Sequence, residues 1–276
     1  MTIKQALKSI FLLCSLLNTF AWSQSAWVLN DNLLNLSSVG NTGGYGTLYQ
    51  GGFRSVTDYG VNGVFLPSQS GVQIATTGLS YSFNESLVSG NPTGGTVRSQ
   101  WQNNPSATME EETASLNSYF TPRGINWAAN ALFAESNAGI TYDLYAIGSS
   151  LGKTFSKFST YFGNHVGIDT IGGGMDPANL SKTGDASYAI IVDGQLLASG
   201  TGYTARNPFS GLIEVDLTGS NRFLTLVIGD NGDDQQWDHG VFVAPTLTTQ
   251  AVPEPNLLAL LALGGLALVL NKRRRA

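Results

Sequence analysis

Short segments in which apolar and polar residues alternate recur through the second half of this 276-residue chain. A period of two is the pattern of a strand with one buried face, because successive side chains point to opposite sides of a sheet. Three segments alternate, 140–146, 154–162 and 213–217, and two more, 187–193 and 223–228, are apolar enough for central strands. Glycine, serine, threonine and asparagine are abundant and charges are sparse, as suits short strands joined by tight turns. The sequence therefore predicts an all-β fold, an antiparallel β-sandwich.

Turn signals and the first half of the chain add further elements. Asp193-Gly194 lies between a predicted strand and a second apolar run, which predicts a β-hairpin. The elements expected in the first half are two strands, 61–66 and 71–79, and one short helix, 109–119.

The first 23 residues have the parts of a secretory signal peptide. Lys4 and Lys8 supply the positive start, and residues 10–21 form an apolar stretch too short to span a bilayer comfortably. Small residues then stand at the two positions that a signal peptidase reads. We therefore expect cleavage before Gln24.

Three ordered parts occupy the C-terminal end. The tripeptide Pro253-Glu254-Pro255 is stiff and extended, because proline fixes φ and disfavours helix before it. The 14 residues 257–270 are apolar. As a helix they would be about 21 Å long, short of a hydrocarbon core of roughly 30 Å. A basic tail would hold the end on the cytoplasmic side of a membrane; its arginines are Arg273, Arg274 and Arg275.

This combination of a Pro-Glu-Pro tripeptide, a short apolar helix and a basic tail resembles the PEP-CTERM sorting signal. The resemblance implies an exported protein of a Gram-negative bacterium, held briefly by its tail in the inner membrane and cleaved near the tripeptide by an exosortase. The partners implied are signal peptidase and an exosortase-type enzyme. The destination is the cell surface or the extracellular matrix, in association with extracellular polysaccharide. The alternative is an ordinary tail anchor, which the short apolar stretch disfavours.

The body between the two ends is strongly acidic. It has eight basic and 18 acidic residues, a net charge of −10. Such a body repels nucleic acid and anionic lipid, so nucleic-acid binding is excluded. Cys14 is the only cysteine and lies in the signal peptide. We therefore expect the mature chain to have no disulfide and no cysteine-ligated metal.

A second set of motifs runs from Thr121 to about Leu247. In order these are RGI at 123–125, AGITYDL at 138–144, Phe158 through GID at 167–169, IIVDG at 190–194 with Ser199-Gly200, IEVDL at 213–217, and Leu224 through Asp230 with Gly232-Asp233 and Asp238-His239. This succession resembles the NPCBM type of carbohydrate-binding module, of the kind found beside glycoside hydrolases such as family 98. The resemblance implies a galactose-binding-like β-sandwich (a jelly roll) that binds carbohydrate.

The chain departs from that family pattern at one point. The family often continues its Asp-His pair into a Trp-containing run, where this chain has Gly240, Val241 and Phe242. Phe242 can replace the tryptophan if that residue packs the core. If the tryptophan contacts sugar, the substitution weakens the expectation of binding.

These features divide the chain into four predicted parts. They are the signal peptide at 1–23, an N-terminal β-rich part of the body at 24–120, the NPCBM-like sandwich at 121–250, and the PEP-CTERM segment at 252–276.

The densest acidic cluster follows the predicted strand 223–228. Its carboxylates are Asp230, Asp233, Asp234 and Asp238. Ca²⁺ takes six to eight oxygen ligands from such loops, so these four residues are candidate Ca²⁺ ligands. The spacing is not that of the twelve-residue calcium loop, because no Glu closes it. The alternative interpretation is a solvated acidic turn.

Two aromatic residues are candidates for contact with sugar. Trp237 lies beside the acidic cluster and Tyr203 lies in a Gly-rich turn. An aromatic ring with a few polar groups suits a sugar, whose apolar C–H faces are ringed by hydroxyls. His239 is the third candidate contact. The alternative for all three is ordinary packing in the core or at a strand end.

No catalytic residue is predicted. Gly148-Ser149-Ser150-Leu151-Gly152 satisfies the G-x-S-x-G pattern, but that pattern needs a strand before it and a helix after it. A second strand is expected to follow, so a Gly/Ser hairpin explains these residues better. His165 and His239 are the only histidines, too few for a zinc site without carboxylate ligands.

The sequence thus predicts an exported, non-catalytic envelope or matrix protein that binds carbohydrate or exopolysaccharide through a β-sandwich. Two alternatives stay open. One is a structural matrix protein without a sugar site, and the other is a secreted hydrolase using Ser150 or paired carboxylates.

Overall fold

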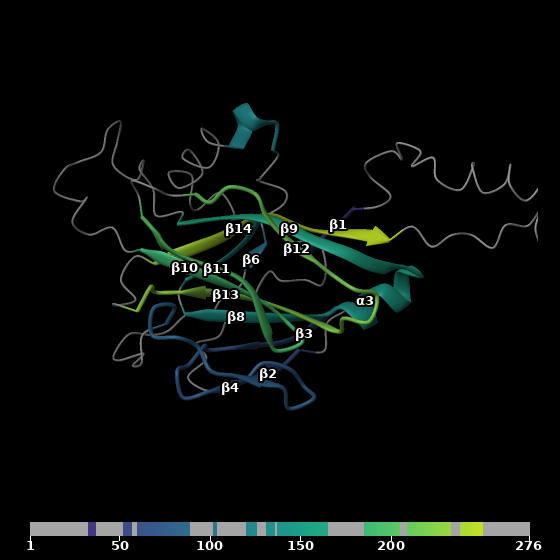
Figure 1. Cartoon of the computed structure of the whole chain (residues 1–276), viewed down its shortest axis with the longest axis horizontal. Helices are drawn as coiled ribbons and strands as arrows, with labels where there is room; N and C mark the ends of the chain where they lie inside the picture. Colours follow the sequence, from purple (N-terminus) through teal and green to yellow (C-terminus); the bar gives the residue numbers. More distant parts are fainter. Residues whose placement is uncertain are drawn as a thin grey trace, which may run out of the picture. The chain divides into compact units, whose positions relative to one another are not determined.

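The computed structural model describes residues 33–36, 52–56, 60–88, 102–103, 120–125, 131–135, 137–164, 185–204, 209–232 and 238–250. These ranges belong to one compact unit, Leu33–Gln250. Within them strands dominate and every strand pairing is antiparallel. Two large sheets lie face to face (Figure 1). The predicted all-β antiparallel sandwich is confirmed.

Sheet A has the strand order β12-β9-β14-β7-β6, with β1 also paired to β14. Its strands are β1 (Leu33–Asn35), β6 (Gln102–Asn103), β7 (Ala131–Glu135), β9 (Thr154–Asn164), β12 (Ile213–Asp216) and β14 (His239–Gln250). Sheet B has the order β11-β10-β13-β8-β3-β2. Its strands are β2 (Arg54–Ser55), β3 (Val61–Phe65), β8 (Ala138–Asp143), β10 (Ala186–Val192), β11 (Gln195–Tyr203) and β13 (Phe223–Gly229). The remaining described elements are β4 (Val72–Gln73), β5 (Ser80–Tyr81), the 3₁₀ helix η3 (Thr121–Arg123) and the α-helix α3 (Leu144–Leu151).

The strands β10 and β13 are the central strands that the sequence predicts, since all of their residues are buried. The predicted hairpin after β10 is also confirmed. Asp193 and Gly194 both have positive φ, 49° and 82°, which is the conformation of a two-residue type I′ turn. Such a turn matches the natural twist of the two strands that it joins, β10 and β11.

The predicted strand 140–146 is wrong after Asp143, and the Gly/Ser hairpin predicted to follow it is wrong. The strand β8 ends at Asp143, and α3 occupies Leu144–Leu151. The Asp143 carboxylate accepts a hydrogen bond of 2.9 Å from the Ala146 N–H, so it caps the helix start. Gly152, with φ of 63°, ends the helix in the left-handed conformation. Caps at both ends thus favour one helical segment over a continued strand.

The expected strand 71–79 is a hairpin instead. Val72 pairs with Tyr81, so β4 and β5 run back on each other. The Ile74 N–H donates to the Leu79 carbonyl, which closes the turn between them.

The strand expected at 61–66 is confirmed as β3. The predicted helix 109–119, the signal peptide and the C-terminal segment lie outside the described residues. No helix in the described ranges is long and apolar enough to span a membrane.

Large apolar side chains from both sheets fill the space between them. Phe162 of β9 lies at the centre of an aromatic cluster, with ring centroids 5.0 Å from both Phe242 of β14 and Tyr188 of β10. Phe242 is fully buried. It therefore packs in the core, the role that the sequence allows for it in place of the family's tryptophan.

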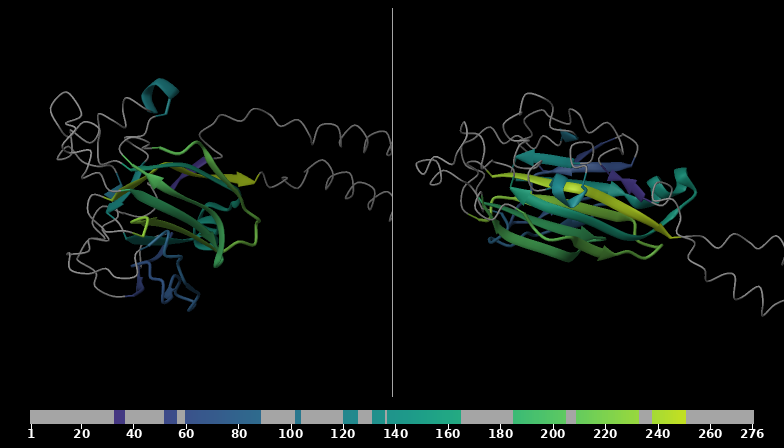
Figure 2. Two further views of the ribbon diagram at one scale, coloured as in Figure 1. Left: turned by 60° about the vertical axis from the view of Figure 1, so that its left-hand side comes forward. Right: turned by 90° about the horizontal axis from the view of Figure 1, so that it is seen from above.

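A third layer covers the outer face of sheet B. We call residues 66–88 the cover; they appear in blue beneath the strands of sheet B in Figure 1 and in the left view of Figure 2. Its apolar side chains pack with Phe65 against outward-facing residues of β10 and β13. The cover's members of this cluster are Val72, Ile74, Phe83, Leu87 and Val88. The central strands β10 and β13 of sheet B are therefore buried on both faces.

Small side chains on sheet B make room for this layer. Gly139 of β8 lies under the Phe65 ring, and a Cβ there would overlap the ring. Thr141 donates a hydrogen bond of 2.6 Å to the Ile74 carbonyl, and Ser187 donates one of 2.7 Å to the Leu87 carbonyl. The sheet thus presents hydroxyls where the cover presents backbone acceptors. Buried polar groups are satisfied in this way across the interface.

Strands of the predicted N-terminal part also enter both large sheets. Leu34 of β1 is opposite Leu247 of β14, and Val64 of β3 is opposite Ile140 of β8. The predicted division between 24–120 and 121–250 therefore separates strands that share sheets.

The close packing of Phe65, the last residue of β3, on Gly139 of β8 gives a direct stability test. Gly139→Ala forces the Phe65 ring or the backbone to move, so we expect it to lower the free energy of unfolding by about 1–3 kcal/mol. Gly211→Ala is the matched control, because a Cβ there meets no atom within 4 Å. Urea unfolding midpoints measure both changes. Equal midpoints for the two variants would show that the close contact between Gly139 and the Phe65 ring is absent.

Candidate functional site

Several strand ends meet at one end of the sandwich. In sheet B, Gly229 is opposite Ser187, and Tyr203 is opposite Ala186, the residue before Ser187. In sheet A, Gly240 is opposite Asn164, and a Cβ at Gly240 would meet Ile228 of the facing sheet. We call this end the loop end. Its described residues include Asn137, Asp185, Tyr203, 230–232 and Asp238.

The topology therefore brings the candidate residues toward one place. Tyr203 ends β11, Asp230 follows β13, and Asp238 and His239 begin β14. Of His239 only the backbone is described, and Trp237, Asp233 and Asp234 lie outside the described residues. Their roles in binding sugar or Ca²⁺ stay predictions.

Asp230 is fully buried and is held by Asn137. The Asn137 amide donates to one carboxylate oxygen at 2.8 Å, and the Asp230 N–H donates to the Asn137 amide oxygen at 3.0 Å. The other carboxylate oxygen accepts from the Gly232 N–H at 3.1 Å. Asp230 thus fixes the turn that leaves β13, and the buried Asn137 is a residue that sequence analysis missed.

A second pair lies beside the first. The Asn231 amide donates to the Asp185 carboxylate at 2.6 Å, which ties the β13 turn to the start of β10.

Asp238 is also fully buried. Among the described residues, no group of three or more His, Cys, Asp or Glu side chains could hold a metal ion. The candidate set for Ca²⁺ depends on Asp233 and Asp234 and is still a prediction.

Tyr203 is partly buried and packs inward. Its ring centroid lies 5.3 Å from that of Phe162 and 5.9 Å from that of Tyr188. Tyr188 donates a hydrogen bond to the Tyr203 hydroxyl. Gly200 permits this pairing, since a Cβ there would come within 2.7 Å of the Tyr203 hydroxyl oxygen. The two tyrosines form an aromatic base beneath the loop end, with one phenol partly accessible.

Burial and the neighbouring tyrosine perturb this pair. Burial first, and then the charge and hydrogen bond of Tyr203, together raise the pKa of Tyr188 to about 12. Burial also raises the pKa of Tyr203, opposed by its hydrogen bond with Tyr188. Both phenols are therefore neutral hydrogen-bonding groups at physiological pH.

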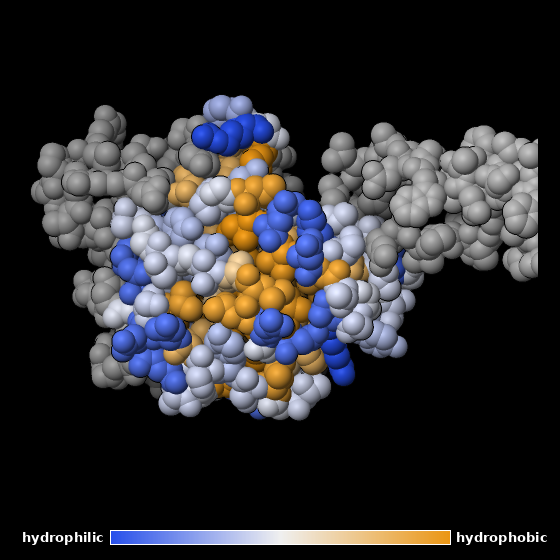
Figure 3. All heavy atoms as spheres, viewed as in Figure 1, coloured by the Kyte–Doolittle hydropathy of each residue, from blue (hydrophilic) through white to orange (hydrophobic). Residues whose placement is uncertain are grey.

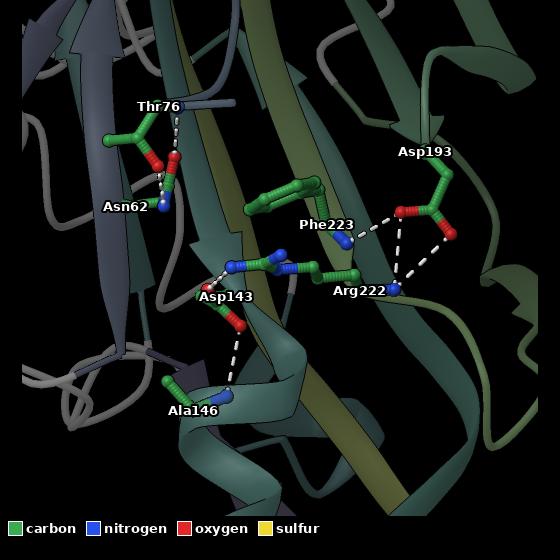
Figure 4. A network of polar contacts seen from close by, with 7 residues as sticks. All are labelled: Asn62, Thr76, Asp143, Ala146, Asp193, Arg222 and Phe223. Carbon is green, nitrogen blue, oxygen red and sulfur yellow. Dashed lines mark hydrogen bonds and ion pairs between the residues drawn. The ribbon is translucent and has the colours of Figure 1, made fainter. Parts of the chain in front are cut away.

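The opposite end of the sandwich carries a different network (Figure 4). The Asp193 carboxylate accepts hydrogen bonds from the Arg222 and Phe223 N–H groups, the latter at 2.8 Å. The Arg222 guanidinium lies 3.5 Å from the Asp143 carboxylate. These contacts join the β10–β11 turn to the start of β13 and to the cap of α3. The network is explained by turn and helix geometry.

Ser150 lies near this second end, in the last turn of α3. Its hydroxyl donates to the Ile147 carbonyl at 2.8 Å. A helix does follow a strand here, contrary to the expectation of a hairpin. However, the nucleophile pattern places its serine on the turn between strand and helix, and Asp143 is the residue at that turn.

An apolar patch occupies a third region of the surface. Figure 3 shows it on the face that carries β11 and β12. The exposed large apolar residues of these two elements are Leu196 and Leu197 in β11 and Leu212 directly before β12. β11 is an edge strand of sheet B and carries no charged residue. This patch suits contact with protein better than contact with sugar, because it offers few polar side chains.

The Tyr188 pKa predicts a loss of stability at alkaline pH. The unfolded chain gives up the phenol proton near the ordinary pKa of 10.0, whereas the folded chain keeps it to about pH 12. The contribution of the neutral Tyr188 phenol to the free energy of unfolding is therefore intact below pH 10 and is lost as the pH rises toward 12. We expect Tyr188→Phe to lose less stability than the wild type between pH 9 and pH 12.

Unfolding midpoints across this pH range measure the effect. Tyr145→Phe is the control, because Tyr145 is 70% exposed on α3. Parallel pH profiles for the wild type and Tyr188→Phe would contradict the assignment.

Comparison with known proteins finds two matching families. Residues 136–248 match the NPCBM/NEW2 domain and residues 251–275 match the PEP-CTERM protein-sorting motif. No curated protein matches the sequence.

Solved structures with similarity to this chain include three that contain modules named CBM51. A Clostridium perfringens ZmpB structure, the M60 catalytic domain with two CBM51 domains, is 24% identical, with a TM-score of 0.34, over 44% of this chain and 11% of that chain. The CBM51 of Clostridium perfringens GH95, in complex with methyl-galactose, is 19% identical, with a TM-score of 0.33, over 44% of this chain and 70% of that one.

The tandem CBM51 modules of Sp3GH98, a family 98 glycoside hydrolase of Streptococcus pneumoniae, are 21% identical, with a TM-score of 0.34, over 45% of this chain and 33% of that one. The matched region is thus a small part of the first of these proteins. Each likeness has low identity and a TM-score under 0.5, so it identifies no ligand for this chain. The two family matches confirm both resemblances: residues 136–248 are similar to the NPCBM/NEW2 domain, and residues 251–275 are similar to the PEP-CTERM protein-sorting motif.

Proposed function

We propose that the mature protein is a non-catalytic glycan-binding protein of the cell surface or extracellular matrix, and that it holds its ligand at the loop end. The observation that carries the proposal is the NPCBM/NEW2 match, combined with the layers that cover the central part of the outer face of sheet B and part of that of sheet A. A domain of this family is expected to bind carbohydrate. The covered parts of the two sheets then limit the places where a sugar can contact polar side chains.

The chain itself covers part of the outer face of each sheet. The cover buries the outer face of sheet B. On sheet A, Phe120 and Phe209 pack over Val241 and Val243, with Tyr161 against them. A sugar laid on either of these regions would have to displace buried aromatic rings. The loop end is where polar side chains and the candidate residues gather instead.

The chemistry of the loop end suits a saccharide. Asn231 and Asp185 offer amide and carboxylate groups that are already oriented by hydrogen bonds to each other. The Tyr203 phenol adds a neutral group that both donates and accepts. Trp237, in the connection between β13 and β14, is the candidate platform for a sugar face. Fixed polar groups around an aromatic platform are what carbohydrate binding requires.

The two ends of the chain support export. The signal peptide would take the chain across the inner membrane, and the PEP-CTERM motif would hold it there until an exosortase-type enzyme cleaves near Pro253-Glu254-Pro255. Release of the body would then deliver it to the surface or matrix of a Gram-negative cell. Its net charge of −10 keeps it soluble and away from anionic lipid.

The second candidate function is a structural matrix protein without a sugar site. The observation in its favour is the uncharged β11 edge with exposed Leu196 and Leu197, since an unprotected edge strand can pair with another chain. Self-association without retention on any glycan would support this second function.

The test is retention of the secreted protein, residues 24–250, on a panel of immobilised polysaccharides, with and without Ca²⁺. We expect binding to at least one glycan and a loss of roughly tenfold or more on Trp237→Ala, the usual effect of removing an aromatic anchor. Tyr145→Ala, at the opposite end, is the matched aromatic control and should bind normally.

Three outcomes separate the alternatives. No retention on any glycan, in either condition, would sink the binding proposal. An unchanged melting temperature on adding Ca²⁺ or chelator would count against an ion held by Asp230, Asp233, Asp234 and Asp238. A hydrolytic activity that Ser150→Ala abolishes would be needed to support the hydrolase alternative.

A further inference from the structure

One turn of the cover lies at the loop end although it is far from the NPCBM/NEW2 match in sequence. Residues 84–88 form a compact turn around Asn84. The Asn84 carbonyl accepts from the Leu87 and Val88 N–H groups at 2.9 and 3.1 Å, and the Asn84 side chain accepts from the Ser86 N–H at 3.0 Å. The turn is therefore held by its own hydrogen bonds, before any contact with sheet B is counted.

Two glycines let this turn press against the end of β13. A Cβ at Gly229 would overlap the Leu87 carbonyl, and a Cβ at Gly232 would overlap the Glu85 carbonyl. Ser187 adds a hydrogen bond of 2.7 Å to the Leu87 carbonyl. The backbone of Glu85 is thus in close contact with the β13–β14 connection, which carries Asp230 and leads to Trp237.

Some side chains of the turn are buried and hold it in place, and the others are exposed to solvent. Leu87 and Val88 are buried with the cover, whereas Asn84, Glu85 and Ser86 are exposed. Because Asn84 uses its side-chain oxygen within the turn, Glu85 is the ionisable group that this turn presents to solvent. A rigid backbone with an exposed carboxylate is a preorganised wall for a ligand.

A carboxylate near this turn is held by a neutral amide. Asp185 accepts a hydrogen bond of 2.6 Å from the neutral amide of Asn231. By contrast, two ion pairs lie away from the loop end. They join Lys157 to Glu214 at 2.9 Å and Arg222 to Asp143 at 3.5 Å.

We propose that the turn 84–88 forms one wall of the glycan site at the loop end, and that Glu85 makes this site select uncharged glycans over acidic ones. The inference rests on the proposed function and specifies its ligand class. The Glu85 carboxylate can accept charge-assisted hydrogen bonds from sugar hydroxyls. It repels a uronate that comes within the screening distance of about 8 Å at physiological ionic strength.

The experiment compares retention of residues 24–250 on neutral polysaccharides (dextran, galactan and glucomannan) and acidic ones (alginate and hyaluronan). The variants are Glu85→Gln and Glu85→Lys. The matched controls are Asp216→Asn and Asp216→Lys, which change an exposed carboxylate on β12, away from the loop end. Urea midpoints check that each variant folds as the wild type does.

We expect the wild type to bind a neutral glycan and to bind the acidic ones weakly. Glu85→Gln should weaken the neutral interaction by about tenfold, the loss of one hydrogen bond to a charged group. Glu85→Lys should raise retention on acidic glycans at least several-fold, with a salt dependence that the wild type lacks. Both Asp216 variants should follow the wild type.

The negative outcomes are distinct. If the wild type binds acidic glycans as tightly as neutral ones, or if both Glu85 variants match the Asp216 controls, the selectivity inference is overturned while glycan binding stands. If no wild-type binding occurs on any polysaccharide of either class, the proposed function fails and this inference fails with it.

Discussion

The fit of the cover against the outer face of sheet B is the contact on which the rest of the structure depends. The strands β10 and β13 have apolar residues on both faces, so a two-layer sandwich would leave one apolar face in water. Glycine and hydroxyl side chains on that face let the cover approach closely, and Thr141 and Ser187 bind its carbonyls. The same contact positions residues 84–88 at the loop end. One packing interaction thus supports the core and shapes the candidate site.

Much of the sandwich could be predicted from the sequence, because alternation and turn chemistry are local. The apolar runs of β10 and β13 and the Asp193-Gly194 turn needed no distant partner to be recognised. The helix α3 was missed although Asp143 and Gly152 are ordinary caps, because the alternation of β8 continues past Asp143 in the sequence. The pairing of β3 with β8 joins residues nearly 80 positions apart, and no local pattern reports it.

The candidate site was predictable in part for the same reason. The acidic cluster, Tyr203 and Trp237 stand out by composition. Asn137 and Asp185 do not, because each acquires its role only when β8 and β10 bring it beside the β13 turn. Glu85 belongs to a segment outside the family match, and only the three-layer packing places it there. When a site is assembled from strand ends, the sequence can therefore indicate single residues of the site. The residues that surround them are known only from the fold.

Hydrogen–deuterium exchange with a bound polysaccharide tests the account most directly, since it reports where the ligand slows backbone exchange. The central claim is that a glycan contacts the loop end, with a wall supplied by the cover. It predicts protection in peptides that span 84–88, 185–188 and 229–240, with no change in α3 or at the β11 edge around 195–198. Protection confined to the β11 edge or to α3, with the loop end unchanged, would contradict it.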